Sequence, residues 1–220
     1  MPDLASILPV SEPDFTTLAE FIYSSKLTLA INGFLYDDWP NEAAQKPIYR
    51  QAVESSFNNP ESHCLKAVDQ ESGDIIGYLV LTRKRPGEGS SPEEESTAGQ
   101  EVPEGMNPDV FCAVAQAVNN ITQETDKLDR LELTFIYVKP SHRKQGIGAL
   151  LMREAFSRAE AEGVILYLCS EPAAHDFYKR RGFQDIIHAD IDLSKWAPPY
   201  SGFGLFRWTG MTWTPSEECS

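Results

Sequence analysis

The sequence predicts an α/β or α+β protein with a mixed sheet and a parallel strand pair at its centre. The main observation is the strand–helix–strand–helix–strand alternation over residues 131–191, which is typical of a sheet covered by helices. A second observation is that the apolar runs, such as 75–81, are far shorter than the 18 residues of a membrane span. At 220 residues, the chain is long enough for one core and short for two. We therefore expect a single domain over 1–220.

The charge balance narrows the choice of partners. Nineteen Lys and Arg stand against 33 Asp and Glu, a formal net charge of −14. Broad surfaces for nucleic acid or anionic membranes need clustered positive charge, so neither partner is expected and a cationic partner is favoured. The N-terminus lacks the pattern of a secretory signal, and the four cysteines form no C-x-x-C pair. We expect a cytoplasmic protein with reduced thiols and no metal site.

The first third of the chain predicts two helices and a hairpin. Helical spacing of apolar residues predicts a helix over 14–31. Asn41 is a good cap for a second helix that ends before Asn58. The apolar face of this second helix is expected to consist of Ile48, Ala52, Val53 and Phe57. Strands over 63–68 and 75–83 flank a turn-like segment and form the hairpin.

Residues 86–108 interrupt this pattern. They contain six Glu, four Pro and four Gly, with no Lys, Arg or aromatic residue. Such a composition cannot bury enough apolar area to offset its ordering entropy. We expect an acidic, solvated insertion within the domain, and a well-ordered functional lid is the alternative.

The remaining elements alternate regularly. The apolar spacing predicts helices over 109–125, 146–162 and 173–181, and strands over 131–138, 164–169, 183–191 and 203–213. Gly163 and Gly182 stand where the second and third of these helices should stop.

A basic turn between strand 131–138 and helix 146–162 is the first functional motif. It contains Arg143, Lys144, Gly146 and Gly148. Backbone N–H groups at the positive end of a helix dipole bind anions, and glycines let a phosphate approach them. The dinucleotide and P-loop fingerprints do not fit this segment. The turn predicts a phosphate site, and a merely tight structural turn is the alternative.

A second motif follows about thirty residues later. It reads Glu171-Pro172-Ala173-Ala174-His175-Asp176-Phe177-Tyr178-Lys179-Arg180-Arg181-Gly182-Phe183. Together with Arg143-x-x-Gly146-x-Gly148, it resembles the two signatures of the GNAT superfamily of acyl-CoA-dependent N-acyltransferases. The second signature has the form Asn-x-x-Ala-x-x-Phe/Leu-Tyr-x-x-x-Gly-Phe. Its Asn position is occupied here by Glu171, so the family contact of that side chain with the pantetheine arm does not carry over.

The resemblance implies a GNAT fold, in which the central sheet is mixed and mostly antiparallel. Its parallel pair splays apart, and the strand at 131–138 carries a bulge. The implied donor is acetyl-CoA, with no metal. The implied cofactor-binding residues are Ile136, Tyr137, Val138, Arg143, Lys144, Gln145, Gly146, Ile147, Gly148, Ala149, Ala174 and Phe177. The acceptor is expected to border the connection between the first two helices, at Tyr36, Asp37, Asp38 and Trp39, for which ordinary loop residues are the alternative.

Acyl transfer to an amine makes two proton demands. An alkylammonium of pKa near 10 must lose a proton, and the departing thiolate gains from receiving one. The resemblance implies Glu132 as the base and Tyr178 as the acid. The alternatives are an exposed strand-start carboxylate and a packing aromatic. Glu132 is expected to share a strand face with Thr134 and Ile136.

Three further side chains receive plainer interpretations. His142 and His175 are expected to be solvated, and Cys169 to be a small core residue rather than an acyl-carrying nucleophile.

The sequence thus predicts an N-acetyltransferase that moves an acetyl group to a primary amine by direct attack in a ternary complex. The acceptor is expected to be a small molecule or peptide with positive charge, and a homodimer is a candidate assembly. One alternative is a non-catalytic GNAT-fold module that binds acyl-CoA or a partner protein. A third possibility is a nucleotide-binding protein that uses the same anion-binding turn.

Overall fold

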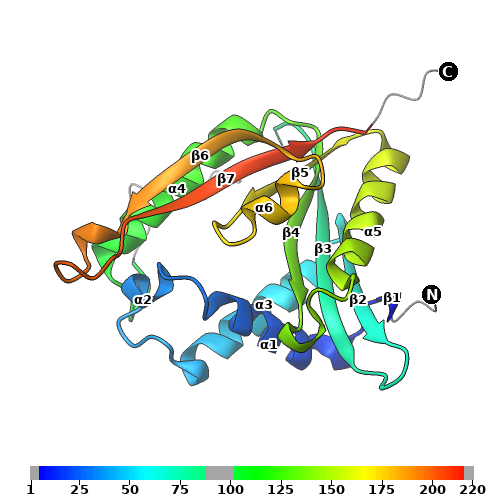
Figure 1. Cartoon of the computed structure of the whole chain (residues 1–220), viewed down its shortest axis with the longest axis horizontal. Coiled ribbons are helices and arrows are strands. Elements are labelled where there is room, and N and C mark those ends of the chain that lie inside the picture. The colour runs from blue at the N-terminus through cyan, green and yellow to red at the C-terminus, as the bar shows by residue number, and fades with distance from the viewer. Residues whose placement is uncertain (1–4, 88–101, 216–220) are drawn as a thin grey trace.

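Seven strands form one twisted sheet in the computed structural model, which describes residues 5–87 and 102–215 (Figure 1). The strand order is β1-β2-β3-β4-β5-β7-β6, and only the pair β4–β5 is parallel. The strands are β1 Ala5–Pro9, β2 Ser62–Asp69, β3 Ile75–Lys84, β4 Arg130–Val138, β5 Ile165–Ser170, β6 Gln184–Asp192 and β7 Leu205–Trp213. The expected mixed, mostly antiparallel sheet with one parallel pair is confirmed.

Helices cover both faces of this sheet. They are α1 Phe15–Lys26, α2 Asn32–Leu35, α3 Glu42–Asn58, α4 Pro108–Thr125, α5 Ile147–Glu162 and α6 His175–Lys179. Alternating residues of β5 show the two layers, because Leu166 and Leu168 pack in the cluster of α5 while Tyr167 packs in that of α4. The helices α1 and α3 cover the same face as α4, over β2 to β4.

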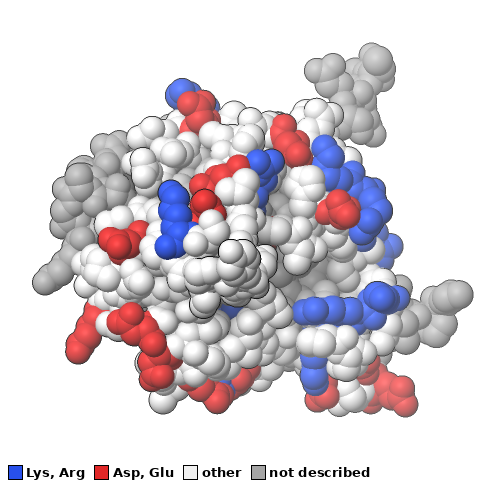
Figure 2. Space-filling view, turned by 60° about the vertical axis from the view of Figure 1, so that its left-hand side comes forward, with Lys and Arg blue, Asp and Glu red and all other residues white. Residues whose placement is uncertain are grey.

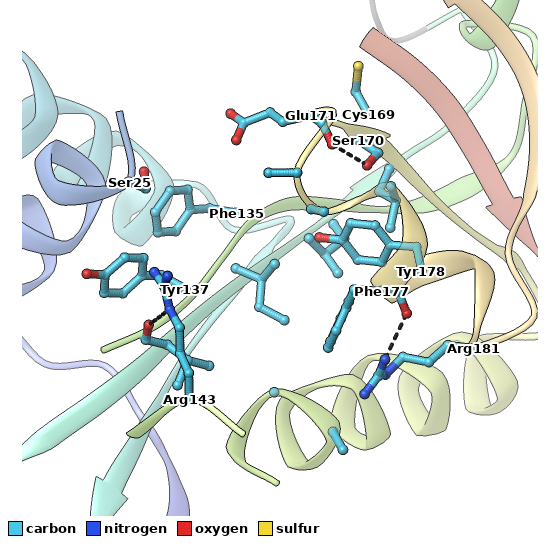
Figure 3. Close-up of a pocket in the computed structure, with 18 of the residues that line it drawn as sticks. Ser25, Phe135, Tyr137, Arg143, Cys169, Ser170, Glu171, Phe177, Tyr178 and Arg181 are labelled. Atoms are coloured by element: carbon cyan, nitrogen blue, oxygen red, sulfur yellow. Dashed lines mark hydrogen bonds between the residues drawn. The ribbon is translucent and has the colours of Figure 1, made fainter. Parts of the chain in front are cut away.

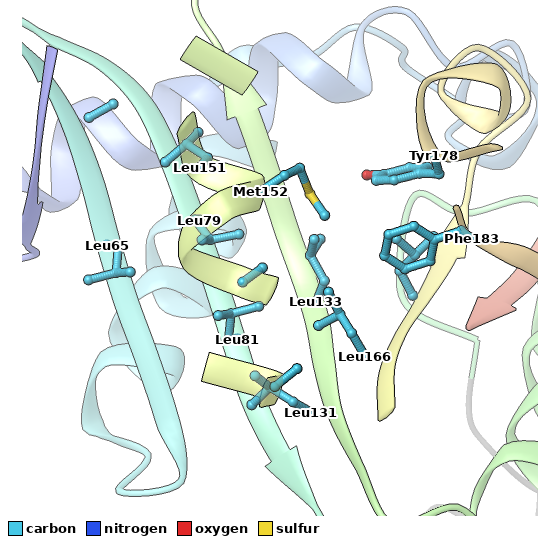
Figure 4. Close-up of a cluster of buried hydrophobic side chains, with 14 of the residues drawn as sticks. Leu65, Leu79, Leu81, Leu131, Leu133, Leu151, Met152, Leu166, Tyr178 and Phe183 are labelled. Carbon is cyan, nitrogen blue, oxygen red and sulfur yellow. The ribbon is translucent and has the colours of Figure 1, made fainter. Parts of the chain in front are cut away.

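The core beneath α5 is the larger of the apolar clusters and fixes the position of this helix (Figure 4). Leu151, Met152 and Ala155 are fully buried against the sheet. Burial of a leucine or methionine side chain contributes about 1.5–3 kcal/mol to stability. The helix that follows the basic turn is therefore anchored firmly to the strand that precedes it.

The parallel pair separates soon after it begins. Only three residue pairs join β4 to β5, namely Arg130–Ile165, Leu131–Leu166 and Glu132–Tyr167. Beyond Glu132, the two strands diverge and leave a V-shaped opening in the sheet (Figure 1).

A bulge in β4 lies at the start of this opening. Leu133 pairs with Leu81 and Phe135 with Val80, so Thr134 is the extra residue. The bulge reverses the alternation of faces, and Ile136 joins Leu133 on the α5 side while Phe135 packs on the other. The expected common face of Glu132, Thr134 and Ile136 is therefore wrong.

The N-terminal elements differ from the predicted ones in their bounds and in the side chains that they bury. The helix predicted over 14–31 is interrupted at Leu27, and β1 was not predicted. Asn41 caps α3 as expected, since its Oδ1 accepts from the Ala44 N–H at 3.1 Å. The predicted apolar face of α3 is wrong at Ile48, which is 50% exposed, and at Ala52 and Phe57, whereas Val53 is buried as expected. The helix buries Gln45, Tyr49 and Val53, the i, i+4, i+8 stripe that packs beside α1.

The acidic insertion is described only at its ends, and residues 88–101 lie outside the described residues. The end that leads into α4 packs against the connection around α2 rather than extending into solvent. Met106 forms a β-bridge with Tyr36, and the Asn107 N–H donates to the Leu35 carbonyl at 2.9 Å. This end of the insertion is therefore ordered, contrary to the expected solvated segment. Over 5–87 and 102–215, we find no helix long and apolar enough to cross a membrane.

Candidate active site

A pocket of about 700 Å³ fills the opening between β4 and β5 (Figure 3). Its walls come from the second half of β4, the start of α5, the end of β5, α6 and the end of α1. The lining includes Ser25, Lys26, Thr134, Phe135, Ile136, Tyr137, Val138, Arg143, Lys144, Gly146, Gly148, Ala149, Cys169, Ser170, Glu171, Ala174, Phe177, Tyr178, Arg180 and Arg181. Most of the residues predicted to bind the cofactor are thus brought together.

The basic turn forms one end of this pocket. Lys144 and Gly146 both adopt left-handed backbone conformations, at φ 61° and 89°, and α5 begins at Ile147. The Arg143 Nε donates to the Val138 carbonyl at 3.0 Å, and its guanidinium lies 5.7 Å from the centre of the Tyr137 ring. These contacts hold a cation beside the first turn of α5, where free N–H groups favour an anion.

Phe177 and Arg181 extend the basic end along α6. The Phe177 ring packs directly on α5 at Gly148, where a Cβ would lie 3.4 Å from the ring. The Arg181 guanidinium stacks 3.5 Å from the centre of that ring and donates to the Phe177 carbonyl at 2.7 Å. Sequence reasoning missed Arg180 and Arg181 as pocket residues, although the basic run within the second motif was a usable signal.

Tyr178 occupies the middle of the pocket. Its side chain is only 5% exposed, and its hydroxyl points into the opening (Figure 3). Burial raises the pKa of this phenol, and the charge of Glu171 adds to the increase. The hydroxyl therefore keeps its proton at neutral pH and can donate it or hydrogen-bond with it.

Cys169 lines the opposite end, and its assignment to the core is wrong. The thiol is open to the pocket because β5 has no partner on this side once it leaves β4. Desolvation by the surrounding protein raises the pKa of Cys169 to about 12, and the negative charges of Glu132 and Glu171 add to the increase. Cys169 is consequently a neutral thiol at physiological pH, which does not suit a nucleophile.

Glu171 and Lys26 meet at the same end. The Lys26 Nζ at the end of α1 lies 3.2 Å from Glu171 Oε1, and both side chains are about one-third exposed. This contact links α1 to the turn after β5 across the pocket mouth. Neither Lys26 nor Ser25 carried a sequence signal, since residues 145 positions apart come together only in the folded chain.

Glu132 lies outside the pocket lining. Its Oε2 accepts from the Arg130 Nε at 3.1 Å and lies 3.0 Å from the Arg130 Nη2. Arg130 is itself buried and donates to the Thr125 carbonyl at the end of α4. Glu132 is nevertheless near enough to Cys169 to raise the pKa of that thiol. The structure thus leaves Glu132 out of the pocket lining and does not bring it into one cavity with Tyr178.

Two of the predicted cofactor-binding residues, Gln145 and Ile147, are absent from the pocket lining. The Ile147 side chain is buried in the core beneath α5. The Gln145 side-chain amide donates to the Ser141 carbonyl at 3.0 Å.

The residues predicted to border the acceptor lie outside the pocket, where three of them contact one another or Asn41. Tyr36 stacks on Trp39 with ring centres 5.3 Å apart, and Asp38 accepts from the Asn41 side chain at 2.8 Å. Neither these residues nor Asp37 line the pocket.

The two histidines have specific partners. His175 Nε2 lies 3.1 Å from both oxygens of Asp185, and His142 Nδ1 lies 2.9 Å from the Ser141 hydroxyl. His175 thus lies partly exposed in the first turn of α6 and also contacts Asp185. Within the described ranges, no group of three His, Cys, Asp or Glu side chains could hold a metal ion.

The charge is unevenly distributed over the surface despite the net value of −14. In the space-filling view, Lys and Arg side chains gather on the right of one face beside a hollow, while the lower left edge carries Asp and Glu (Figure 2).

A splayed parallel pair, a basic helix start and a protonated phenol facing the gap together define a protein class. Sites of this class suit a phosphate-bearing, extended ligand that lies across the opening of the sheet.

Comparison with known proteins identifies the family. Residues 29–183 match the model of the acetyltransferase (GNAT) family. The match covers more than half of the chain, which therefore belongs to this family of acyl-CoA-dependent acetyltransferases. No curated protein matches the sequence significantly.

Solved structures with this fold are numerous. Arylalkylamine N-acetyltransferase 2 from Aedes aegypti is similar at TM-score 0.67 and 13% identity, covering 96% of this chain and 99% of its own. An agmatine N-acetyltransferase is similar at TM-score 0.61 and 18% identity, covering 96% and 100%. A polyamine N-acetyltransferase from Drosophila melanogaster is similar at TM-score 0.60 and 16% identity, covering 96% and 99%. At these identities the likeness shows the fold.

Proposed function

We propose that this protein transfers the acetyl group of acetyl-CoA to the nitrogen of a primary amine. One observation supports this most strongly. A single pocket carries the basic, glycine-containing helix start at one end and a neutral Tyr178 hydroxyl with a carboxylate beside it towards the other. The first end suits the phosphates of coenzyme A, and the second suits proton handling at an amine.

The residues present fit coenzyme A. Phosphates would lie at the N-terminus of α5, where a Cβ on Gly146 would meet open space, with Arg143, Lys144 and Arg181 supplying charge. The pantetheine amides would pair with the backbone of Ile136, Tyr137 and Val138, because β5 leaves this edge of β4 without a strand partner. Ala149, Ala174 and Phe177 would flank the arm. When bound, acetyl-CoA supplies an acyl thioester that is activated toward amines.

Two residues handle protons in this proposal. The raised pKa of Tyr178 keeps its phenol protonated, so that it can donate to the leaving sulfur. Glu132, held by Arg130 and close enough to Cys169 to influence its thiol, accepts the amine proton through water that enters the pocket. The amine attacks directly in a ternary complex, since the neutral thiol of Cys169 does not favour a covalent acyl-enzyme.

The proposed acceptor is a small amine that carries positive charge. The net charge of −14 attracts cations toward the surface. Three proteins of the same fold are named for the acetylation of arylalkylamines, agmatine and polyamines. These names support the substrate class proposed for this chain.

A coupled assay tests the proposal. The protein is incubated with acetyl-CoA and a panel of monoamines, diamines and polyamines, and thiol release is followed together with the acetylated product. We expect amine-dependent thiol release that saturates in both substrates. Coenzyme A binding without turnover on any amine would favour the non-catalytic module, and absence of coenzyme A binding would contradict both.

A further inference from the structure

The polar groups of the pocket are divided between its two ends. Arg143, Lys144, Arg180 and Arg181 lie at the end formed by α5 and α6. Among the described residues that line the pocket, Glu171 is the one carboxylate, and it lies at the end where Cys169 opens into the cavity (Figure 3). A ligand with phosphates at the basic end must therefore carry its reactive end toward Glu171.

The carboxylate of Glu171 is only half engaged. Lys26 contacts Oε1 at 3.2 Å, whereas Oε2 has no hydrogen-bond partner among the described residues. The Lys26 contact orients the side chain across the mouth, and the second oxygen remains available. A carboxylate oxygen in this position is an acceptor for the N–H groups of an ammonium ion.

Electrostatics place Glu171 beside the groups where transfer must occur. Its charge raises the pKa of both the Cys169 thiol and the Tyr178 phenol. The carboxylate therefore acts on the middle and the far end of the pocket at once. An ammonium held there would share the cavity with the Tyr178 hydroxyl.

We infer that Glu171 is the acceptor-binding residue of this enzyme, receiving the acceptor's ammonium group on Oε2 while Lys26 holds Oε1. This inference rests on the proposed function and adds the residue that selects a cationic acceptor. Glu171 confers specificity, and proton removal remains with Glu132.

The rival explanation is a contact with the cofactor. The related family motif carries Asn at this position, and an amide there would face the pantetheine arm. The two explanations predict different substrates to be affected by substitution. A cofactor contact changes the KM for acetyl-CoA, whereas an acceptor contact changes the KM for the amine.

The kinetic test uses Glu171→Gln and Glu171→Asn, with agmatine, spermidine and phenethylamine as probes. Glu160→Gln, an exposed carboxylate on α5 outside the pocket, is the matched control. We expect both Glu171 variants to raise the KM for the amine tenfold or more, and the KM for acetyl-CoA less than twofold. Loss of a hydrogen bond to a charged group justifies this magnitude. An unchanged amine KM, or a Glu171→Asn effect confined to acetyl-CoA, would overturn the inference.

A binding measurement separates this inference from the proposed function. Each amine is titrated calorimetrically into the protein saturated with coenzyme A, which cannot transfer an acetyl group. We expect saturable binding that Glu171→Gln weakens tenfold or more and Glu160→Gln leaves unchanged. Such binding without turnover would disprove the proposed function and leave the inference standing. Turnover with equal amine affinity in wild type and Glu171→Gln, or no saturable amine binding in the wild type, would disprove the inference.

Discussion

At the scale of single residues, the pocket is distinguished by groups that hold their protons. The surrounding protein and two carboxylates raise the pKa of Cys169, and burial raises that of Tyr178. Both side chains are neutral at physiological pH, while Glu132 and Glu171 provide negative charge nearby. The site therefore combines a proton donor with carboxylates rather than a thiolate nucleophile.

Removing the Glu171 charge should make the Cys169 thiol more reactive. Glu171→Gln lowers the pKa of Cys169 from about 12, and the thiolate fraction at pH 9 rises. We expect alkylation of Cys169 by iodoacetamide to accelerate, since loss of the Glu171 charge raises the fraction of thiolate. Peptide mass mapping follows each cysteine separately, and exposed Cys112 is the internal reference. An unchanged rate at Cys169 would show that Glu171 does not face this thiol.

The two proton-handling roles should separate in their pH dependence. In the proposed mechanism, Glu132→Gln loses the base, so kcat/KM should fall about 10²-fold at pH 6 and recover as free amine becomes abundant at high pH. Retention of wild-type kcat/KM from pH 6 to 9 would exclude Glu132 as the base.

Tyr178→Phe keeps the ring that packs against Phe183 but loses the donor hydroxyl. We expect kcat to fall about 10²-fold. Raising the pH should not restore it, because the missing function is proton donation. Thermal shift with coenzyme A checks that the variant still binds the cofactor. A kcat equal to that of the wild type would remove Tyr178 from the mechanism.

At the scale of elements, α5 has a left-handed glycine at each end. Gly146 precedes its first residue at φ 89°, and Gly163 follows its last at φ 67°. A Cβ would meet nothing within 4 Å at either position, so an alanine costs only backbone strain. The two ends differ in function, because the pocket includes Gly146 and not Gly163.

Alanine at these two glycines should have the same structural effect and different functional effects. Both variants should lose about 1–2 kcal/mol of stability, the cost of a left-handed non-glycine residue. Coenzyme A at a hundred times its dissociation constant should stabilise Gly163→Ala by about 2.7 kcal/mol, as in the wild type. Gly146→Ala should require more ligand, because its Cβ narrows the phosphate site. Equal ligand dependence in denaturant titrations would contradict the anion-site assignment.

Most elements could be predicted from the sequence because their signals are local. The stripe at Leu151, Met152 and Ala155 predicts α5, and Gly163 predicts its end. The face of α3 could not be predicted, because burial of Gln45 depends on where α1 packs. The bulge at Thr134 carries no composition signal, and it places Ile136 on the face opposite to the expected one.

At the scale of the whole molecule, the two motifs predicted one end of the pocket and long-range contacts supply the other. Lys26 reaches Glu171 across 145 positions, and no spacing rule connects them. The acceptor residues predicted around Asp37 lie in a different part of the fold, where α2 meets α4. A sequence motif locates the end of the pocket that binds its ligand group. The residues of the opposite end depend on how distant segments pack.

Buried phenols should make the whole fold sensitive to alkaline pH. Burial raises the pKa of Tyr49, Tyr78, Tyr167 and Tyr178 above the ordinary value near 10. The folded state then binds these protons more tightly than the unfolded chain, so this stability is complete below pH 10 and is lost as the pH rises above it. Urea unfolding at pH 8 to 11 should show the loss.

One substitution assigns part of that sensitivity to a single phenol. Tyr178→Phe should reduce the alkaline loss by up to about 1.4 kcal/mol per pH unit above pH 10. The fully exposed Tyr200 provides the control, and Tyr200→Phe should leave the slope unchanged. Identical slopes in both variants would show that the Tyr178 phenol ionises freely in the folded protein.

The early divergence of β4 from β5 also determines how the backbone exchanges hydrogen with solvent. Successive amides of β4 alternate between β3, which pairs along its length, and the side from which β5 departs after Glu132. Beyond the bulge at Thr134, deuterium should therefore enter every second amide over 135–138 quickly and the intervening ones slowly. Coenzyme A laid along the open edge would slow only the fast set. The exchange pattern of one strand, measured amide by amide, would thus show which backbone groups hold the cofactor arm.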